Sequence, residues 1–269
     1  MANIVKVALC LPWYNGSDRD TCANNLNFLL YLGRLQERSW WLANTPGEPP
    51  EGVMPPLDWV NDGHIPREMR GTIFQFGIAD ETGCSLVGMA RERTVDNALA
   101  WGADYILFWD DDMLFATDAF LRLYGADKPV CAALAFTARA PISPVIFRFD
   151  TWDVSPAGPD TFKTAHVFDY RRDALQQVDA VGSGMVLIRA DVFRQLPKPW
   201  FATGSAMGED IYFCYRCKKL GIDVWVDTRV KTLHKRTFPG WHDELEYLKL
   251  YEAATHDSNP QLAEPAAAL

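Results

Sequence analysis

Three consecutive carboxylates, Asp110, Asp111 and Asp112, follow an almost uniformly apolar run at residues 104–109. At the end of a buried strand such groups repel one another unless a cation lies among them. Carboxylate oxygens are hard ligands, which Mg²⁺ and Mn²⁺ prefer. Alternation along a strand would place Asp110 and Asp112 on one side and Asp111 on the other. The triplet therefore predicts a divalent metal site, with a solvated acidic turn or a helix-capping cluster as the alternative.

His234 is the second candidate, because it lies in the most basic stretch of the chain, residues 229–236. The cations of this stretch are Arg229, Lys231, Lys235 and Arg236. A metal-chelated diphosphate needs cationic neighbours for its remaining charge, and a histidine can ligate the same metal. A lone histidine near a strand end is more often a surface or core residue. Together with the Asp triplet, His234 is predicted to be a metal ligand.

Glu209 and Asp210 follow Gly208 at the start of a predicted helix. Acidic residues in a first helical turn ordinarily satisfy free backbone N–H groups and the helix dipole. A carboxylate at this place could instead act as general base on an acceptor hydroxyl. Spacing along the sequence does not choose between these two interpretations.

Apolar runs and helical spacing predict the elements that would position these groups. Strands are predicted at residues 4–11, 72–78, 104–109, 130–136, 145–149, 178–188 and 223–226. Helices are predicted at residues 22–42, 85–101, 117–124, 190–196 and 209–220. Prolines disrupt residues 44–71, which are predicted to form a long loop, and residues 151–173 are predicted to be irregular.

Strands alternate with helices in the first half of the chain and cluster in the second half. This order predicts an α/β fold with a mixed, mainly parallel sheet flanked by helices. In open α/β sheets, ligands bind outside the carboxyl ends of the strands. Three candidate segments fall at such ends: residues 12–16, residues 110–112 and the residues that follow Gly208.

The composition limits the class of protein. The 269 residues are 48% apolar and carry 26 basic and 35 acidic side chains, for a formal net charge of −9. This apolar content excludes a disordered chain, and the acidic excess disfavours indiscriminate binding to nucleic acid or anionic membrane. Arg139 interrupts the most apolar long stretch, residues 129–147, so no membrane span is predicted.

The cysteines and the N-terminal strand bear on the compartment. Residues 4–12 lack the basic region and the cleavage site of a secretion signal, so the six cysteines are expected to be reduced thiols in the cytoplasm. Cys214 and Cys217 form a single C-x-x-C with no second pair to complete a zinc site. Packing in the core is therefore the preferred interpretation for both.

Taken in order, these motifs resemble the nucleotide-sugar-dependent glycosyltransferases of the GT-A fold, in particular those of family 2. The resemblance extends over residues 4–236. It is carried by Pro12-x-Tyr14-Asn15, by Ala90-Arg91 with Asn97, by residues 102–113, and by Glu209-Asp210 followed by His234. The resemblance implies one GT-A catalytic domain at residues 1–252, with a Rossmann-like sheet. Residues 1–115 would form its nucleotide-binding half, residues 116–252 its acceptor-binding half, and residues 253–269 a flexible tail.

The resemblance also implies roles for individual residues. Asp110 and Asp112 match the D-x-D motif, which together with His234 would hold Mn²⁺ or Mg²⁺. Asp210, beside Glu209, matches the catalytic base of inverting members. The donor-binding residues would be Pro12, Trp13, Tyr14, Arg91, Asn97, Asp110, Asp111 and Lys235. The acceptor-binding residues would be Gly182, Ser183 and Gly184, whose small size lets a substrate come close to the backbone.

The implied activity is the transfer of a sugar from a UDP- or GDP-sugar to an acceptor hydroxyl on a glycan, a small molecule, a protein or a modified nucleobase. The Q-x-x-R-W sequence of many processive members is absent after the Glu-Asp pair, so polymer synthesis is not expected. Two alternatives are a nucleotidyltransferase and a non-catalytic carbohydrate-binding protein. The first would normally carry a Gly-rich phosphate loop after its first strand, and the second would suit the ten tryptophans.

Overall fold

The computed structural model describes residues 3–13, 19–44, 72–82, 84, 86–138, 141–153, 161–203, 207–235, 241–245 and 247–249. The helices are α1 (Arg19–Asn44), α3 (Val87–Trp101), α4 (Ala119–Gly125), α5 (Ala190–Gln195) and α6 (Glu209–Lys219). The strands up to the middle of the chain are β1 (Asn3–Trp13), β2 (Thr72–Thr82), β3 (Tyr105–Trp109), β4 (Met113–Phe115), β5 (Val130–Leu134) and β6 (Ile146–Asp153). Those that follow are β7 (Thr161–His166), β8 (Leu175–Val178), β9 (Ala180–Val181), β10 (Met185–Arg189), β11 (Val224–Lys235) and β12 (Trp241–His242).

Within the described residues, a nine-stranded sheet has the order β12-β11-β5-β10-β3-β1-β2, and β4 and β8 pair additionally with β11. The β1–β2, β1–β3 and β5–β11 pairs are parallel, whereas β10 is antiparallel to both of its neighbours. A three-stranded sheet, β7-β6-β9, lies beside it. The predicted fold class, a mixed and mainly parallel sheet flanked by helices, is confirmed.

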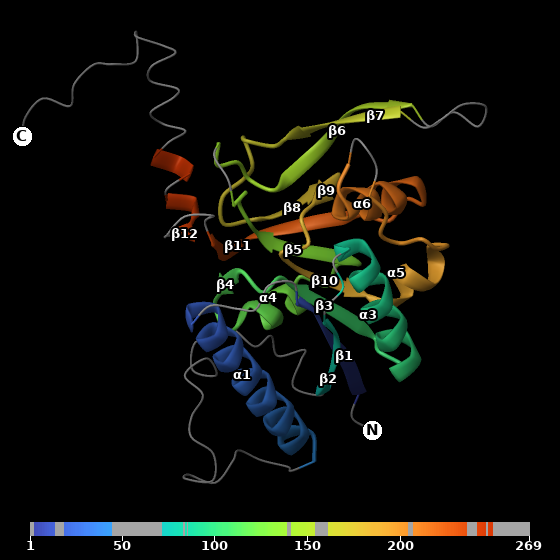
Figure 1. Ribbon diagram of the computed structural model, residues 1–269. Helices are drawn as coiled ribbons and strands as arrows, with labels where there is room; N and C mark the ends of the chain where they lie inside the picture. Colours follow the sequence, from blue (N-terminus) through green and yellow to red (C-terminus); the bar gives the residue numbers. More distant parts are fainter. Residues whose placement is uncertain are drawn as a thin grey trace, which may run out of the picture.

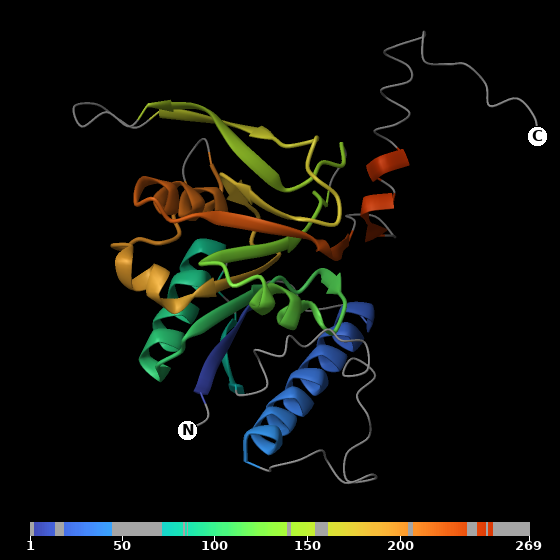
Figure 2. The same ribbon diagram turned by 180° about the vertical axis from the view of Figure 1, so that it is seen from behind.

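Helices cover both faces of the large sheet (Figure 1). Figure 2, the view from behind, shows the same arrangement, with α1 and the β6–β7 hairpin at opposite ends of the molecule in both views. In β3, Leu107 and Trp109 pack in the core with residues of α1 and α4, while Ile106 and Phe108 pack in the core with residues of α3, α5 and α6. Because β3 is buried on both faces, the sequence before the Asp triplet is apolar throughout.

The largest difference from the predicted elements is the length of β11, which continues to Lys235 instead of ending near residue 226. Its alternating pattern of buried Val and Thr with exposed Arg and Lys is that of a half-buried strand. The charged residues hide this pattern in the sequence. The short strands β4 and β7 were also not predicted, and β6 extends into the stretch expected to be irregular.

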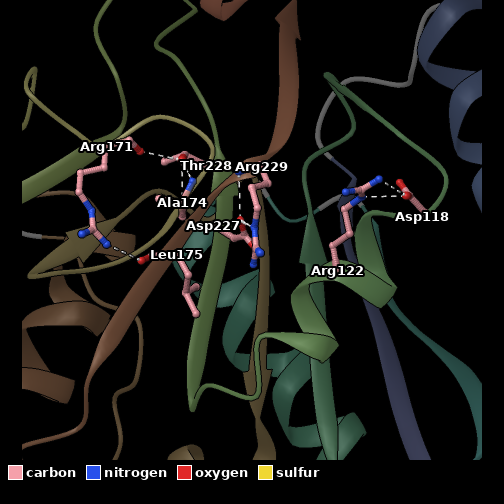
Figure 3. Close-up of polar contacts among 8 residues, drawn as sticks. All are labelled: Asp118, Arg122, Arg171, Ala174, Leu175, Asp227, Thr228 and Arg229. Carbon is pink, nitrogen blue, oxygen red and sulfur yellow. Dashed lines mark hydrogen bonds and ion pairs between the residues drawn. The ribbon is translucent and has the colours of Figure 1, made fainter. Parts of the chain in front are cut away.

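A bulge in β11 is held by side chains (Figure 3). The buried carboxylate of Asp227 accepts hydrogen bonds from the backbone and the guanidinium of Arg229. The Thr228 hydroxyl accepts the Ala174 N–H at 2.9 Å and lies 2.8 Å from the Arg171 carbonyl, which it can donate to. These contacts fasten the turn before β8 onto β11. They also bring together segments more than 50 residues apart in the sequence.

Two smaller points concern local structure. At the start of α4, the carboxylate of Asp118 bonds Arg122 one turn later at 2.7 Å and makes no side-chain cap to the backbone (Figure 3). Cys214 and Cys217 are both buried thiols of α6, as core packing requires, and burial raises the pKa of Cys214 to about 12. None of the described helices is long and apolar enough to cross a membrane.

Candidate active site

The ends of the central strands converge at the Asp triplet. Cys10 of β1 pairs with Phe108 of β3, so two residues further along Pro12 and Asp110 lie at neighbouring strand ends. The Asp110 N–H donates to the carbonyl of Gly184, just before β10, at 3.0 Å. Three segments that are distant in the sequence therefore meet at the carboxyl end of β3, where ligands bind in folds of this kind.

Arg91 of α3 joins this strand end to helix α6. Its guanidinium is almost fully buried, packs over the ring of Phe108, and places Nη2 2.7 Å from Oδ1 of Asp110. Its Nε lies 3.4 Å from Oε1 of Glu209. The buried Nη1 has no hydrogen-bond partner among the described residues. A buried N–H without an acceptor is costly, so this atom points to a missing anionic or polar ligand.

Burial and neighbouring charges act against each other on this pair. Burial alone would lower the pKa of Arg91, but the nearby carboxylates, Asp110 foremost, raise it overall, so the guanidinium stays charged. Burial raises the pKa of Asp110, and Asp112 adds to this effect, although Arg91 opposes both. The carboxylates at this strand end therefore outnumber the one buried arginine that the described residues place beside them, which favours a second cation.

Asp112 and His234 face each other across the β4–β11 pair. Oδ2 of Asp112 lies 3.2 Å from Nε2 of His234, and the Lys235 N–H donates to the Asp112 carbonyl at 3.0 Å. Nδ1 of His234 lies 2.6 Å from the carbonyl of Phe136, which can only accept, so Nδ1 carries a hydrogen. Metal-binding histidines are typically oriented in this way, with one ring nitrogen on a carbonyl and the other toward the metal.

The pKa of His234 is raised overall. Burial by itself would lower it, but the hydrogen bond to Asp112 and the charge of that carboxylate outweigh the burial. Nε2 of His234 therefore holds its proton more tightly than a free imidazole does, because Asp112 accepts it. A divalent cation between the same two atoms would take the place of that proton.

The residues present fit a metal ion in part. Asp112 and His234 supply two adjacent ligand atoms of suitable chemistry, whereas Oδ1 of Asp110 is already bonded to Arg91. Within the ranges that the structure describes, no group of three His, Cys, Asp or Glu side chains is arranged to hold a metal. Mg²⁺ is commonly bound by one or two carboxylates together with substrate phosphates, so a two-ligand protein site suits a metal that arrives with a diphosphate.

One of the predicted acceptor glycines, Gly182, lies directly beside the predicted base. A Cβ added to Gly182 would lie 2.6 Å from Cγ1 of Val145 and 3.6 Å from Oδ2 of Asp210. A Cβ added to Gly184 would lie 3.2 Å from the side chain of Met113. Ser183 between them is buried. A larger residue at either glycine would meet these side chains, so small residues are required at both positions. The absence of a side chain also leaves the backbone of Gly182 next to Asp210.

Asp210 occupies the first turn of α6. Its pKa is raised to about 6, chiefly by burial and next by the charge of Glu209, while the Ile211 N–H and Arg91 oppose the shift. A Cβ at Gly208 would lie 2.7 Å from Oδ1 of Asp210, so the glycine leaves room for the carboxylate. Glu209 makes the ion pair with Arg91. Both acidic residues thus do more than satisfy the helix terminus.

Other candidate residues lie apart from this group or outside the description. Tyr14 falls outside the described residues, as do the side chains of Pro12 and Trp13. Asn97 lines a separate cavity of about 110 Å³ between α3 and the β1–β2 edge. Of the basic stretch, Arg229 pairs with Asp227, and Lys231 pairs with Glu244 and Asp173. Asp111 is partly buried beside its neighbours in the triplet.

Two features that shape the candidate site could not be predicted from the side-chain chemistry of the sequence. The carbonyl of Phe136 orients His234, and a backbone group leaves no signal in a sequence. Gly208 leaves space for the carboxylate of Asp210. This requirement is seen only in the structure, where a Cβ at position 208 would collide with that carboxylate. A glycine directly before an acidic pair at a helix start is the single hint that the sequence offers.

No protein-family model matches this chain, and no curated protein matches it. Among solved structures, GalNAc-T7 with UDP, GalNAc and Mn²⁺ is similar at a TM-score of 0.51 with 14% identity, over 88% of this chain and 44% of that one. The protein A197 from STIV has a TM-score of 0.46 with 14% identity, over 86% and 85% of the two chains. The catalytic domain of Drosophila beta1,4galactosyltransferase 7 in complex with xylobiose has a TM-score of 0.40 with 14% identity, over 88% of this chain and 67% of that one.

The likeness to GalNAc-T7 concerns the fold. This chain spans less than half the length of that protein, and an identity of 14% extends the likeness no further than the fold. Together with the sheet order and the helices on both faces, the likeness shows a GT-A-like fold. The predicted fold family is therefore confirmed.

Proposed function

We propose that this protein is a metal-dependent glycosyltransferase that moves a sugar from a nucleoside-diphosphate sugar to an acceptor hydroxyl. The observation that carries the proposal is the bridge made by Arg91, which bonds Asp110 on the donor side and approaches Glu209 on the acceptor side. A GT-A-like fold supports it, and the similar structure of GalNAc-T7 contains UDP, GalNAc and Mn²⁺.

The donor would bind at the carboxyl ends of β1 and β3. Asp112 and His234, with Asp110 beside them, would hold Mn²⁺ or Mg²⁺. When bound, such an ion offsets the charge that develops on a departing diphosphate. Arg91, whose Nη1 has no hydrogen-bond partner among the described residues, would contribute positive charge to the donor site. The remaining predicted donor contacts are Pro12, Trp13, Tyr14, Asn97, Asp111 and Lys235.

In the transfer step, Asp210 would accept the proton of the acceptor hydroxyl. The acceptor oxygen then forms a bond to the anomeric carbon, while the bond from that carbon to the diphosphate oxygen breaks and its electron pair leaves with the nucleoside diphosphate. A carboxylate with a pKa of about 6 is ionised at neutral pH yet basic enough to assist. Gly182, Ser183 and Gly184 would border the acceptor, and displacement from the opposite side inverts the anomeric centre.

Mass spectrometry of donor consumption tests the proposal. Wild-type protein is incubated with a panel of UDP- and GDP-sugars in Mn²⁺ or in EDTA, with water and a mixed acceptor panel. Metal-dependent consumption of at least one donor is expected. Asp112→Ala should remove it, whereas Asp150→Ala, an exposed carboxylate of β6, should not. If no donor is consumed, or if Asp112→Ala matches the wild type, the proposed activity is wrong.

A further inference from the structure

A second cavity lies away from the Asp112–His234 pair, between β6 and β8. Its volume is about 410 Å³, and Phe147 and Val167 contribute apolar surface to it. The rest of the lining is largely polar and comes from β6, β8 and the connection before β8. We call this cavity the β6–β8 groove. None of the predicted donor, metal, catalytic or acceptor residues lines it.

The amide side chains of the groove are fixed at one end. Nε2 of Gln177 donates to Oδ1 of Asp223 at 2.7 Å, and Oε1 of Gln176 accepts the Arg171 N–H at 2.8 Å. Within the described residues, the carbonyl oxygen of Gln177 and the amino group of Gln176 have no such partner. Both residues line the groove, so an anchored amide side chain with a polar group to spare is available to a hydroxylated ligand there, which lowers the entropy cost of binding.

The charges of the groove are already neutralised. Arg148 lies 3.1 Å from Asp169, and Lys218 of α6 pairs with Asp179. Each carboxylate keeps lone pairs, and the guanidinium of Arg148 keeps N–H groups, so all can still bond neutral hydroxyls. A polyphosphate backbone would find no excess of positive charge here. Planar polar groups beside an apolar floor favour a neutral, polyhydroxylated ligand.

Helix α6 connects the groove to the proposed acceptor position. Its first turn places Asp210 beside Gly182, the Cys214 thiol reaches the Val181 carbonyl, and Lys218 pairs with Asp179. Eight residues of α-helix measure about 12 Å. The three residues from Asp179 to Gly182 span at most about 11 Å. Both paths place the start of the groove within about 15 Å of the Asp210 carboxylate.

We propose that the β6–β8 groove is a distal acceptor subsite that binds a neutral oligosaccharide, whose nearer end reaches Asp210. The transfer at that end rests on the proposed function, but the binding itself needs neither metal nor donor. An acceptor longer than a single sugar would therefore bind more tightly than a monosaccharide. Among the acceptor classes that the sequence leaves open, this assigns the glycan.

Calorimetric titration with defined sugars tests the subsite without requiring catalysis. The probes are pentasaccharides of glucose, xylose, mannose, galactose and N-acetylglucosamine, each beside its monosaccharide, and an oligothymidylate. The variants are Arg148→Ala and Gln177→Ala, both on exposed side chains. Arg189→Ala is the matched control, because Arg189 also forms an ion pair, with Asp127, at the far end of β10. Thermal unfolding checks that each variant is folded.

At least one pentasaccharide should bind the wild type more tightly than its monosaccharide does. Each groove variant should weaken that binding about tenfold, since hydrogen bonds to such groups are worth about that much, and Arg189→Ala should not. The proposal is overturned if no pentasaccharide binds, if the groove variants bind as well as the wild type, or if only oligothymidylate binds. Loss of pentasaccharide binding in the variants supports the subsite even where neither UDP nor GDP binds, a result that would contradict only the proposed transfer.

Discussion

The donor side and the β6–β8 groove treat charge in opposite ways. On the donor side, Asp110 and Asp112 are two residues apart, the buried Arg91 bonds only Asp110 of the two, and the pKa of Asp110 is raised. In the groove, Arg148 and Lys218 each pair with one carboxylate. One region carries unbalanced negative charge, and the other is balanced.

This difference in charge suggests that the two regions bind different classes of ligand. Excess negative charge is unfavourable in a folded protein unless a cation completes the site, so under the proposed function the donor side would suit a ligand that arrives with a metal. A balanced polar surface gains little from charged ligands and selects by hydrogen bonds. Under the two proposals, an anionic donor and a neutral acceptor would therefore bind at separate places and would not compete.

The largest expected effect is on turnover. Asp210→Asn removes the base but keeps its shape, so kcat should fall by about a thousandfold, within the range for general bases. Binding of the nucleotide should change little, because Asp210 lies beside Gly182, on the proposed acceptor side. Steady-state kinetics measures kcat, and calorimetry measures nucleotide binding, with Asp150→Asn as the control. Full turnover by Asp210→Asn would remove the assignment of the base.

The next largest effect is on stability. Arg91→Met leaves Asp110 and Glu209 without their shared cation, and breaking a buried ion pair costs about 3 to 5 kcal/mol. Urea unfolding should show this loss, whereas Arg189→Met, which disrupts a more exposed pair, should cost about 1 kcal/mol or less. If both variants lost the same free energy of unfolding, the ion pairs of Arg91 would contribute no more to stability than the more exposed pair of Arg189.

A smaller effect should follow from filling space at the acceptor. Gly182→Ala sets a Cβ 2.6 Å from Cγ1 of Val145, and such overpacking typically costs about 1 to 3 kcal/mol. The acceptor KM should rise while donor binding stays constant. The double variant Gly182→Ala with Val145→Ala should recover much of the stability. If it recovers stability but not the acceptor KM, the added methyl itself obstructs the acceptor, which sharpens the position of the site.

The pH dependence should show the raised pKa of Asp210. The proposed base works only when ionised, so kcat/KM for the acceptor should fall about tenfold per unit below pH 6 and level off above it. The effect of Asp210 on the free energy of unfolding changes with pH in the opposite direction to its effect on activity. A carboxyl whose folded pKa exceeds its unfolded value is destabilising above about pH 6, and this penalty disappears below about pH 4. Asp210→Asn should therefore be more stable at neutral pH by roughly 1 to 3 kcal/mol, and not at pH 4, as unfolding at both pH values would show.

How much the sequence predicts depends on the range of the interactions involved. The apolar run before Asp110 predicts β3, and the helical spacing predicts α3 and α6, since these signals are local. The length of β11 was not predicted, because its charged, exposed residues mask the buried ones. The contact of Asp112 with His234 joins residues 122 positions apart, and only the pairing of β4 with β11 creates it.

The groove illustrates the same limit more strongly. Arg148, Gln177 and Asp179 carry no motif, and no periodic pattern relates them. They become one surface because β6 pairs with β9 and β8 pairs with β11. Likewise, the sequence predicts Arg91 as a donor contact, but its bridge to Glu209 depends on how α3 packs beside the start of α6.

The most direct test of the account is the metal dependence of nucleotide binding at His234. Calorimetry with UDP and GDP, with and without Mn²⁺, compares wild type, His234→Ala and His166→Ala. His166 is a matched control because its Nδ1 also bonds a carbonyl, that of Pro144, at 2.8 Å. The account predicts that Mn²⁺ tightens binding of one nucleotide at least tenfold in wild type and His166→Ala but not in His234→Ala. Binding that ignores Mn²⁺, or an equal response in His234→Ala, would contradict it.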